Sequence, residues 1–193
     1  MRVVIERVVA TTALVFLSPV LVTIAAAVSF SSRGGAFYVA ERVGKDGRNF
    51  KLIKFRTMVT GGTGSSRVTV AGDSRITRLG GFLRRWKLDE LPQLVNIAKG
   101  EMSFVGPRPE DPKYVAMYTA EQRRILKFQP GLTSPATILY RNEQSQLRGS
   151  DPETHYIREI LPEKLQTDLA YFSDRNWLSD LGIIMRTMGA IFR

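Results

Sequence analysis

An uncharged run of 23 residues near the N-terminus constrains this chain more than any other feature of its sequence. The run extends from Val8 to Phe30 and reads VVATTALVFLSPVLVTIAAAVSF. A helix of about 20 residues covers the roughly 30 Å hydrocarbon core of a bilayer, so the run is long enough to span it. Three interpretations therefore compete: a signal peptide, a spanning helix and a re-entrant helix that enters and leaves on one side.

The middle and the flanks of this run favour the re-entrant helix. Proline removes a backbone donor and clashes with the preceding turn, so we expect the helix to break at Ser18-Pro19, where the Ser18 hydroxyl can bond a freed carbonyl. Both flanks are net positive, and positive flanks prefer the cytoplasmic side. Each half of the run would reach only about 16 Å, roughly half the hydrocarbon thickness. We therefore predict a re-entrant anchor over residues 1–32, with a bent spanning helix as the alternative.

Composition limits the chemistry of the chain. Of its 193 residues none is cysteine and one is histidine, which excludes disulfide scaffolds, thiolate sites and multi-histidine metal sites. Catalysis would depend on carboxylates, hydroxyls, lysines or arginines. The 28 basic and 18 acidic residues give a net charge of +10. This charge indicates an anionic partner: nucleic acid, a phosphorylated substrate or an acidic membrane surface.

Residues 33–193 are predicted to form one small α+β domain, mainly helical, with a short β-hairpin. The hairpin is expected over residues 37–58, around an Asp-Gly turn at Lys45-Asp46-Gly47. Residues 60–72 are rich in glycine, serine and threonine and indicate a surface loop or a mobile lid. Helical patterns cover residues 76–87, about 89–98, 155–172 and 177–193. The last two are amphipathic, and the final one suits either core packing or a position in a membrane interface.

Two short motifs carry candidate chemistry. Asp89-Glu90 stands at the start of the helix expected over 89–98, where acidic residues are also favoured as simple caps. Pro107 and Pro109 flank Arg108 and fix the backbone on both sides of one guanidinium. That arrangement suits a phosphate clamp or a rigid turn.

Taken together, these motifs resemble the bacterial sugar transferase family, the monotopic phosphoglycosyl transferases. The resemblance covers about residues 1–190. It is carried by the helix-breaking Ser-Pro, ERVGKDGRNFKLIKFRTM, D-x-R-x-T-x-x-G from Asp73 to Gly80, LDELPQLVNIAKGEMSFVGPRPE and Pro130-Gly131-Leu132-Thr133. It implies an enzyme on the cytoplasmic face of the bacterial inner membrane that moves a sugar-1-phosphate from a UDP-sugar to undecaprenyl phosphate. UMP is released, and the product initiates surface glycan synthesis.

The resemblance also implies roles for individual residues. Asp89 would be the nucleophile that forms a phosphosugar-enzyme intermediate, and Mg²⁺ would bind at Asp89 and Glu90. The matching motifs place substrate contacts at Lys54, Arg56, Arg75, Arg84, Arg108 and Arg141. The chain departs from the family pattern at Ser134-Pro135-Ala136-Thr137, where Gly-Trp-Ala-Gln is usual, and this affects the expected sugar or nucleotide specificity.

Two other classes compete with this enzyme. A nucleic-acid-binding protein would explain the basic stretch at 75–87 but not the uncharged run, so no nucleic acid partner is expected. An inactive membrane scaffold of the same fold is disfavoured by the intact Asp89-Glu90. Two roles stay open for Glu90, as a metal ligand or as an orienting or acid–base group, and the sequence points to no particular sugar, glycan pathway or oligomeric state.

Overall fold

The computed structural model describes residues 2–60, 69–70, 72–147 and 151–191. Most of the predicted loop over 60–72, with its alternative role as a lid, lies outside the described residues. The elements, in chain order, are α1 (Arg2–Ser31), β1 (Phe37–Val43), η1 (Lys45–Gly47), β2 (Asn49–Phe55), α2 (Arg78–Arg85), η2 (Leu88–Gln93), α3 (Leu94–Lys99), β3 (Ser103–Val105), α4 (Pro112–Val115), η3 (Gln122–Lys127), β4 (Gly131–Thr133), α5 (Pro135–Leu139), α6 (Glu143–Gln146), α7 (Pro152–His155), η4 (Tyr156–Ile160), α8 (Leu161–Asp174) and α9 (Trp177–Ile191).

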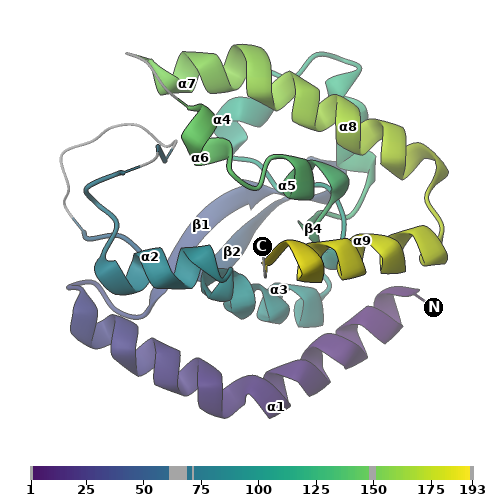
Figure 1. The fold of residues 1–193 in the computed structure, drawn as a ribbon. Coiled ribbons are helices and arrows are strands. Elements are labelled where there is room, and N and C mark those ends of the chain that lie inside the picture. Colours follow the sequence, from purple (N-terminus) through teal and green to yellow (C-terminus); the bar gives the residue numbers. More distant parts are fainter. Residues whose placement is uncertain (1, 61–68, 71, 148–150, 192–193) are drawn as a thin grey trace.

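The elements form layers between two long helices. Figure 1 shows α1 along one edge of the molecule, α2 and α3 lying on it, and α8 along the opposite edge. The hairpin of β1 and β2 lies between these layers. The prediction of a mainly helical α+β domain with a short antiparallel hairpin is thereby confirmed.

Helix α1 continues through Ser18-Pro19 and is not broken there, but it bends near its middle (Figure 1). Proline has no N–H to give the carbonyl four residues earlier, and the Ser18 hydroxyl donates to that carbonyl, Val15 O, at 2.7 Å, as predicted. This bond replaces the missing one, so the helix bends without ending. The re-entrant path of α1 through a membrane stays a prediction.

One face of α1 packs on the rest of the chain along both arms. Ala10 and Val28 are fully buried, the first against Leu94 and Ile97 and the second against Phe55. The other faces are exposed and apolar. By length and composition α1 is the one helix among the described residues that could cross a membrane, and only 6% of its apolar window is buried.

The hairpin follows from its local sequence. Strands β1 and β2 pair antiparallel from Phe37↔Phe55 to Val43↔Asn49. Asp46 and Gly47 both have positive φ, of 56° and 75°, as the two central residues of a type I′ turn require. Because this turn matches the twist of paired strands, Asp-Gly fixes the register that carries Lys54.

The helix predicted over 89–98 begins differently from the prediction. Lys87 takes a left-handed conformation, and Leu88–Gln93 form a 3₁₀ helix, η2, before α3 starts at Leu94. The acidic pair therefore lies inside a 3₁₀ turn and does not cap an α-helix. Gly100 ends α3 in the left-handed conformation, as the sequence predicted.

Strands β3 and β4 form a short parallel pair that the sequence did not predict. Gly106 and Gly131 allow the two chain segments to approach this closely, because a Cβ on Gly131 would lie 2.0 Å from Gly106 N. Gly106 N donates to Thr133 O and Gly131 N donates to Pro107 O, at 3.0 and 2.9 Å. The Pro107-Arg108-Pro109 segment is thus fixed to β4.

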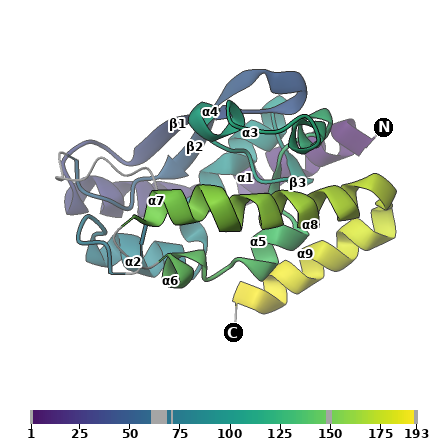
Figure 2. The same cartoon turned by 90° about the horizontal axis from the view of Figure 1, so that it is seen from above.

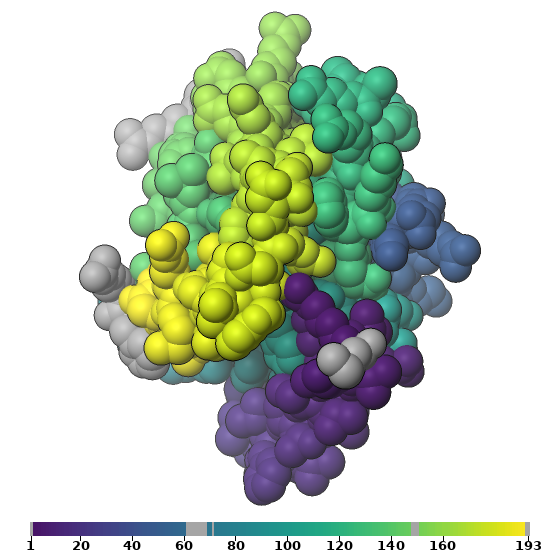
Figure 3. Space-filling model, turned by 90° about the vertical axis from the view of Figure 1, so that its right-hand side faces the viewer, coloured from purple at the N-terminus to yellow at the C-terminus, as the bar shows by residue number. Residues whose placement is uncertain are grey.

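Both predicted helices at the C-terminal end are present, and the last one begins at Trp177 as predicted. A π-helical turn, η4, leads into α8, and α9 follows after a short connection. Figure 2 shows that α8 and α9 meet at one end and diverge toward the other. The start of α1 lies against α9 (Figure 3), where Arg2 pairs with the buried Asp180 at 2.5 Å.

Candidate active site

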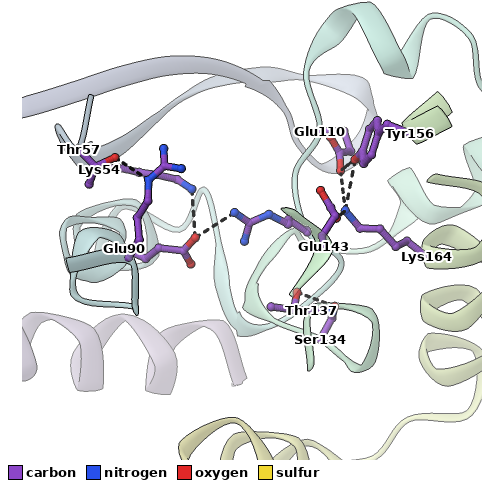
Figure 4. A network of polar contacts seen from close by, with 11 residues as sticks. Lys54, Thr57, Glu90, Glu110, Ser134, Thr137, Glu143, Tyr156 and Lys164 are labelled. Carbon is purple, nitrogen blue, oxygen red and sulfur yellow. Dashed lines mark hydrogen bonds and ion pairs between the residues drawn. The ribbon is translucent and has the colours of Figure 1, made fainter. Parts of the chain in front are cut away.

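The Asp89-Glu90 pair is buried, with 8% of each residue exposed. Two cations converge on one oxygen of Glu90: Lys54 Nζ lies 3.1 Å and Arg108 Nη2 lies 2.9 Å from Oε1. Figure 4 shows Lys54 beside Glu90 in this network. Strand β2, η2 and the segment after β3 each supply one of these three side chains, so the site forms only when the domain folds.

The charges around Glu90 decide its ionisation. Burial alone would raise the pKa of Glu90, but Arg108, Lys54 and Lys87 together hold it well below its usual range. Glu90 in turn raises the pKa of Arg108. Burial lowers the pKa of Lys54, although Glu90 opposes this shift. Glu90 is therefore a carboxylate at neutral pH.

Asp89 differs from its neighbour because its carboxylate has a free oxygen. Asp89 Oδ1 is buried and has no hydrogen-bond partner among the described residues. Burial, and then the charge of Glu90, raise the pKa of Asp89. A buried acceptor without a donor is costly in a folded protein, and such groups call for a functional explanation. Asp89 thus has a lone pair available to a substrate or a cation.

Arg84 approaches Asp89 from α2. Its Nε donates to Thr57 Oγ1 at 2.8 Å, and Asp89 raises its pKa while burial, the larger effect, lowers it. Helix α2 can come this close because residue 80 is glycine: a Cβ on Gly80 would lie 2.1 Å from Thr57 O. Thr57 was not singled out from the sequence, since its role depends on a contact 27 residues away.

Asn96 joins the dyad-bearing segment to the hairpin. Its side chain is fully buried, accepts from Ile53 N at 3.1 Å, and donates to Lys51 O and to Glu101 Oε2, both at 2.7 Å. This carboxamide fixes α3 against β2, and so it sets the position of η2 relative to Lys54. No pattern in the sequence indicated this role.

A second polar cluster, formed by Glu110, Glu143, Tyr156 and Lys164, lies apart from Glu90 and Lys54 (Figure 4). Lys164 Nζ contacts Glu143 Oε2 at 2.7 Å and Glu110 Oε1 at 3.7 Å, and the Tyr156 hydroxyl donates to Glu110 at 2.7 Å. Glu110 and Glu143 both raise the pKa of Arg108. Of this cluster, only Glu110 fell within a motif of the sequence.

Three of the predicted arginines have no contact with the dyad among the described residues. Arg75 pairs with the Asp73 carboxylate, with Nη2 at 2.6 Å from Oδ2. Asp73 also raises the pKa of Arg84, against the larger lowering by burial. Arg56 donates to the carbonyls of Gly35 and Phe37 at the edge of the hairpin. The Arg141 side chain follows α5 and forms no hydrogen bond or ion pair within the described ranges. Their roles in substrate binding stay predictions.

The divergent Ser134–Thr137 segment forms the start of α5. The Ser134 hydroxyl accepts from Thr137 N, and Asp168 Oδ1 accepts from Ala136 N at 2.9 Å. Burial raises the pKa of Asp168 to about 6. The divergent segment therefore forms the first turn of α5. Ser134 caps this turn, and the buried Asp168 of α8 accepts a hydrogen bond from it.

The residues present suit one hard cation. No group of three or more acidic or histidine side chains forms a metal site within the described ranges. Magnesium, however, commonly uses one or two protein carboxylates and completes its shell with water and substrate phosphates. The free Asp89 Oδ1 fits that requirement, and Glu90 offers its oxygens beside it while Oε1 receives two cations.

Comparisons with known proteins identify the family of the chain. The whole chain, residues 1–193, matches the family described as bacterial sugar transferase. It is 35% identical over 197 residues to the exopolysaccharide production protein ExoY of Sinorhizobium fredii, with 93% of this chain and 80% of that protein covered. It is also 35% identical over 192 residues to the UDP-glucose:undecaprenyl-phosphate glucose-1-phosphate transferase of Escherichia coli, with 95% of this chain and 38% of that longer protein covered.

A third relative is similar over a shorter stretch. The chain is 42% identical over 104 residues to a putative undecaprenyl-phosphate N-acetylgalactosaminyl 1-phosphate transferase of Bacillus subtilis, with 53% of this chain and 58% of that protein covered. The names of the second and third relatives describe transfer of two different sugar phosphates. The match over the full length and the buried carboxylate pair lead to the same conclusion: the chain belongs to the bacterial sugar transferase family and is a transferase.

Proposed function

We propose that this protein transfers a sugar-1-phosphate from a UDP-sugar to undecaprenyl phosphate at the inner membrane, through a covalent intermediate on Asp89. The observation that carries the proposal is the asymmetry of the acidic pair. Asp89 has a buried, unpartnered oxygen, while Glu90 is fixed by Lys54 and Arg108. The names of the relatives support the two substrate classes.

The first step uses Asp89 as a nucleophile. An Asp89 oxygen attacks the phosphorus that carries the sugar, the bond from this phosphorus to the bridging oxygen breaks, and UMP leaves with the electron pair. Carboxylates are competent nucleophiles in such covalent catalysis. Arg84, Lys54 and Arg108 lie around the pair and would neutralise charge on the phosphoryl oxygens.

The second step returns Asp89 to its starting state. A phosphate oxygen of undecaprenyl phosphate attacks the same phosphorus, the Asp89–phosphorus bond breaks, and the Asp89 carboxylate is released. The product is undecaprenyl diphosphate sugar. Because the two steps are linked by one covalent intermediate on Asp89, the enzyme handles the soluble nucleotide and the lipid one after the other.

Asp89 and Glu90 would hold the proposed Mg²⁺ together with substrate phosphates. Bound there, Mg²⁺ supplies charge neutralisation at the diphosphate. The side chains do the rest: Asp89 forms the bond to phosphorus, and the cations around Glu90 orient the phosphate groups.

The exposed apolar surface supports a position at the membrane. Val15, Phe16 and Phe30 of α1 are 67%, 79% and 93% exposed. On α9, Trp177 and Met185 are 71% and 65% exposed. Side chains of this size on two helices that meet at the Arg2–Asp180 pair suit insertion into one leaflet. We propose that α1 is re-entrant and that α9 lies in the interface on the cytoplasmic side.

The test of the reaction is UMP release by the purified protein with undecaprenyl phosphate, Mg²⁺ and a panel of UDP-sugars. Release with one sugar, abolished by Asp89→Asn and by a chelator, is the expected result. Thr187→Ala is the matched control, because it removes a hydroxyl contact between α9 and β4 away from the dyad. Equal release by Asp89→Asn would remove Asp89 as nucleophile, and silence with every UDP-sugar would refute the proposed donor class.

The test of the membrane path uses the absence of cysteine from the chain. Single cysteines at the exposed positions Val4 and Arg33 lie at the two ends of α1. A membrane-impermeant maleimide should label both in inside-out vesicles and neither in intact spheroplasts. Labelling of the two positions from opposite sides would show a spanning helix.

A further inference from the structure

A small cavity lies beside the cations of Glu90. It has a volume of about 60 Å³, and its polar lining consists of Arg42, Lys54, Gln93, Arg108 and Glu110. A volume of this size holds a few water molecules, which is also the scale of one phosphate group. The proposed chemistry has so far assigned no role to Gln93.

Gln93 is buried but its amide is not satisfied. The residue is 2% exposed, and its Nε2 has no hydrogen-bond partner among the described residues. Asn96, three residues later and equally buried, uses its carboxamide fully in three hydrogen bonds. Buried amides are normally bonded because desolvation without a partner costs free energy. The unsatisfied Gln93 therefore indicates a partner that arrives from outside the protein.

The 3₁₀ geometry of η2 places Gln93 near the catalytic charges. A 3₁₀ helix has three residues per turn, so side chains three positions apart lie on the same face. Glu90 and Gln93 are three positions apart within Leu88–Gln93. An α-helix over the same residues would also keep the two side chains on one face, but offset by about 60° around the helix axis. The local departure from the expected helix thus aligns Gln93 with Glu90 and its cations.

The charge around the cavity favours an anionic ligand. Lys54 and Arg108 both contact a single oxygen of Glu90, so one carboxylate faces two positive charges. Arg42 is held at the wall by Asp111, at 3.2 Å, and Glu110 accepts from Tyr156. A further cation among these groups would pair with Glu90. A neutral amide donor does not form such an ion pair and can bind a phosphate oxygen.

We infer that Gln93 is a substrate-binding residue whose amide donates a hydrogen bond to a non-bridging phosphate oxygen of the substrate in this cavity. The inference rests on the proposed function. The oxygen comes from the diphosphate of the nucleotide sugar in the first step or from the phosphate of the lipid acceptor in the second. Both present the same chemistry to an amide donor, and the two half-reactions distinguish them.

The test compares Gln93→Met, which keeps the shape and removes the donor, with Gln93→Glu, which keeps an acceptor and adds negative charge. Gln129→Met is the matched control, since it removes an amide bond to Gly100 O away from the cavity. Single-turnover UMP release without lipid reports the first half-reaction, and chase with undecaprenyl phosphate reports the second. Calorimetric binding of UDP with Mg²⁺ and a thermal unfolding curve complete the set.

We expect Gln93→Met to weaken one half-reaction about tenfold, the order expected for one hydrogen bond to a charged oxygen. Gln93→Glu should weaken it further by repulsion. The midpoint of thermal unfolding should stay the same or rise in Gln93→Met, because an unsatisfied donor is removed. If the donor phosphate is the ligand, UDP binding weakens by a similar factor. A defect confined to the lipid chase assigns the oxygen to the acceptor phosphate.

Two results separate this inference from the proposed function. Unchanged rates in both half-reactions and unchanged UDP binding in Gln93→Met would refute the role of Gln93 while leaving the reaction intact. Absence of UMP release by the wild type with every donor would refute the proposed function. In that event, binding of UDP or inorganic phosphate to wild type and Gln93→Met still decides whether Gln93 binds a phosphate oxygen.

Discussion

Replacing Asn96 by aspartate tests how the hairpin holds the dyad in place. The change conserves shape, and the new side chain can still accept from Ile53 N. It replaces the Nδ2 donor, which bonds Lys51 O and Glu101 Oε2 at 2.7 Å each, by an oxygen. This oxygen would face a carbonyl and a carboxylate without a hydrogen to donate. Asn96 is fully buried, so solvent cannot compensate for either loss.

The size of the effect follows from these bonds. A neutral hydrogen bond contributes about 1 kcal/mol and one to a charged group about 2 kcal/mol, so the loss is roughly 3 kcal/mol before repulsion from Glu101. For a chain of this size each kcal/mol shifts the unfolding midpoint by about 2–4 °C, which gives a drop of roughly 6–12 °C.

The assay is thermal unfolding of both proteins in the same detergent, followed by circular dichroism. Asn49→Asp is the matched control, because Asn49 donates one exposed bond to Glu41 on the hairpin. The control should shift the midpoint by no more than about 2 °C, since exposed bonds and charges contribute little. UMP release should fall in Asn96→Asp even below its unfolding midpoint, because Lys54 loses its fixed position. A midpoint equal to that of Asn49→Asp would refute the structural role of Asn96.

Three further changes have defined outcomes. Gly80→Ala places a Cβ 2.1 Å from Thr57 O and should lower the free energy of unfolding by about 1–3 kcal/mol. Gly81→Ala, whose nearest contact is at 4.0 Å, should be neutral or stabilising, and thermal unfolding distinguishes the two variants. Burial raises the pKa of Asp168 from its ordinary value of 3.8 to about 6, so the folded state binds this proton more tightly than the unfolded state. Stability should therefore fall as pH rises from about 4 to 6, by up to roughly 3 kcal/mol, and unfolding of Asp168→Asn across that range should lack this slope. Glu90→Gln removes the charge that Lys54 and Arg108 share and should raise the Mg²⁺ concentration needed for half-maximal UMP release; an unchanged Mg²⁺ dependence would count against metal ligation by Glu90.

Features encoded by adjacent residues were predictable from the sequence. The Asp46-Gly47 turn requires positive φ at both positions, which few other dipeptides accept, so the hairpin and its register follow. The Ser18 bond to Val15 O is equally local, since it replaces the donor that the next residue lacks. Their physical causes lie within a few residues of the chain.

The pairings between distant segments were not predictable in the same way. Arg108 contacts Glu90 because Gly106 and Gly131 allow two three-residue strands to pair closely. Strands this short leave no periodic pattern in the sequence. The 3₁₀ form of η2 was also missed, because Asp, Glu and Pro at this place all favour the first turn of an α-helix. Tertiary packing outweighed that local preference.

The buried Ala10 and Val28 of α1 have a consequence for the proposed encounter with a lipid substrate. Both arms of α1 share their apolar contacts with the segments that carry the hairpin, α2 and α3. A flexible linker would let an active site change its height above a bilayer, whereas α1 is part of the same packed body as the site. If α1 is inserted as we propose, its depth in the bilayer would set the height of Asp89 above the lipid headgroups. The acceptor phosphate would then reach the site at one fixed distance from the bilayer surface.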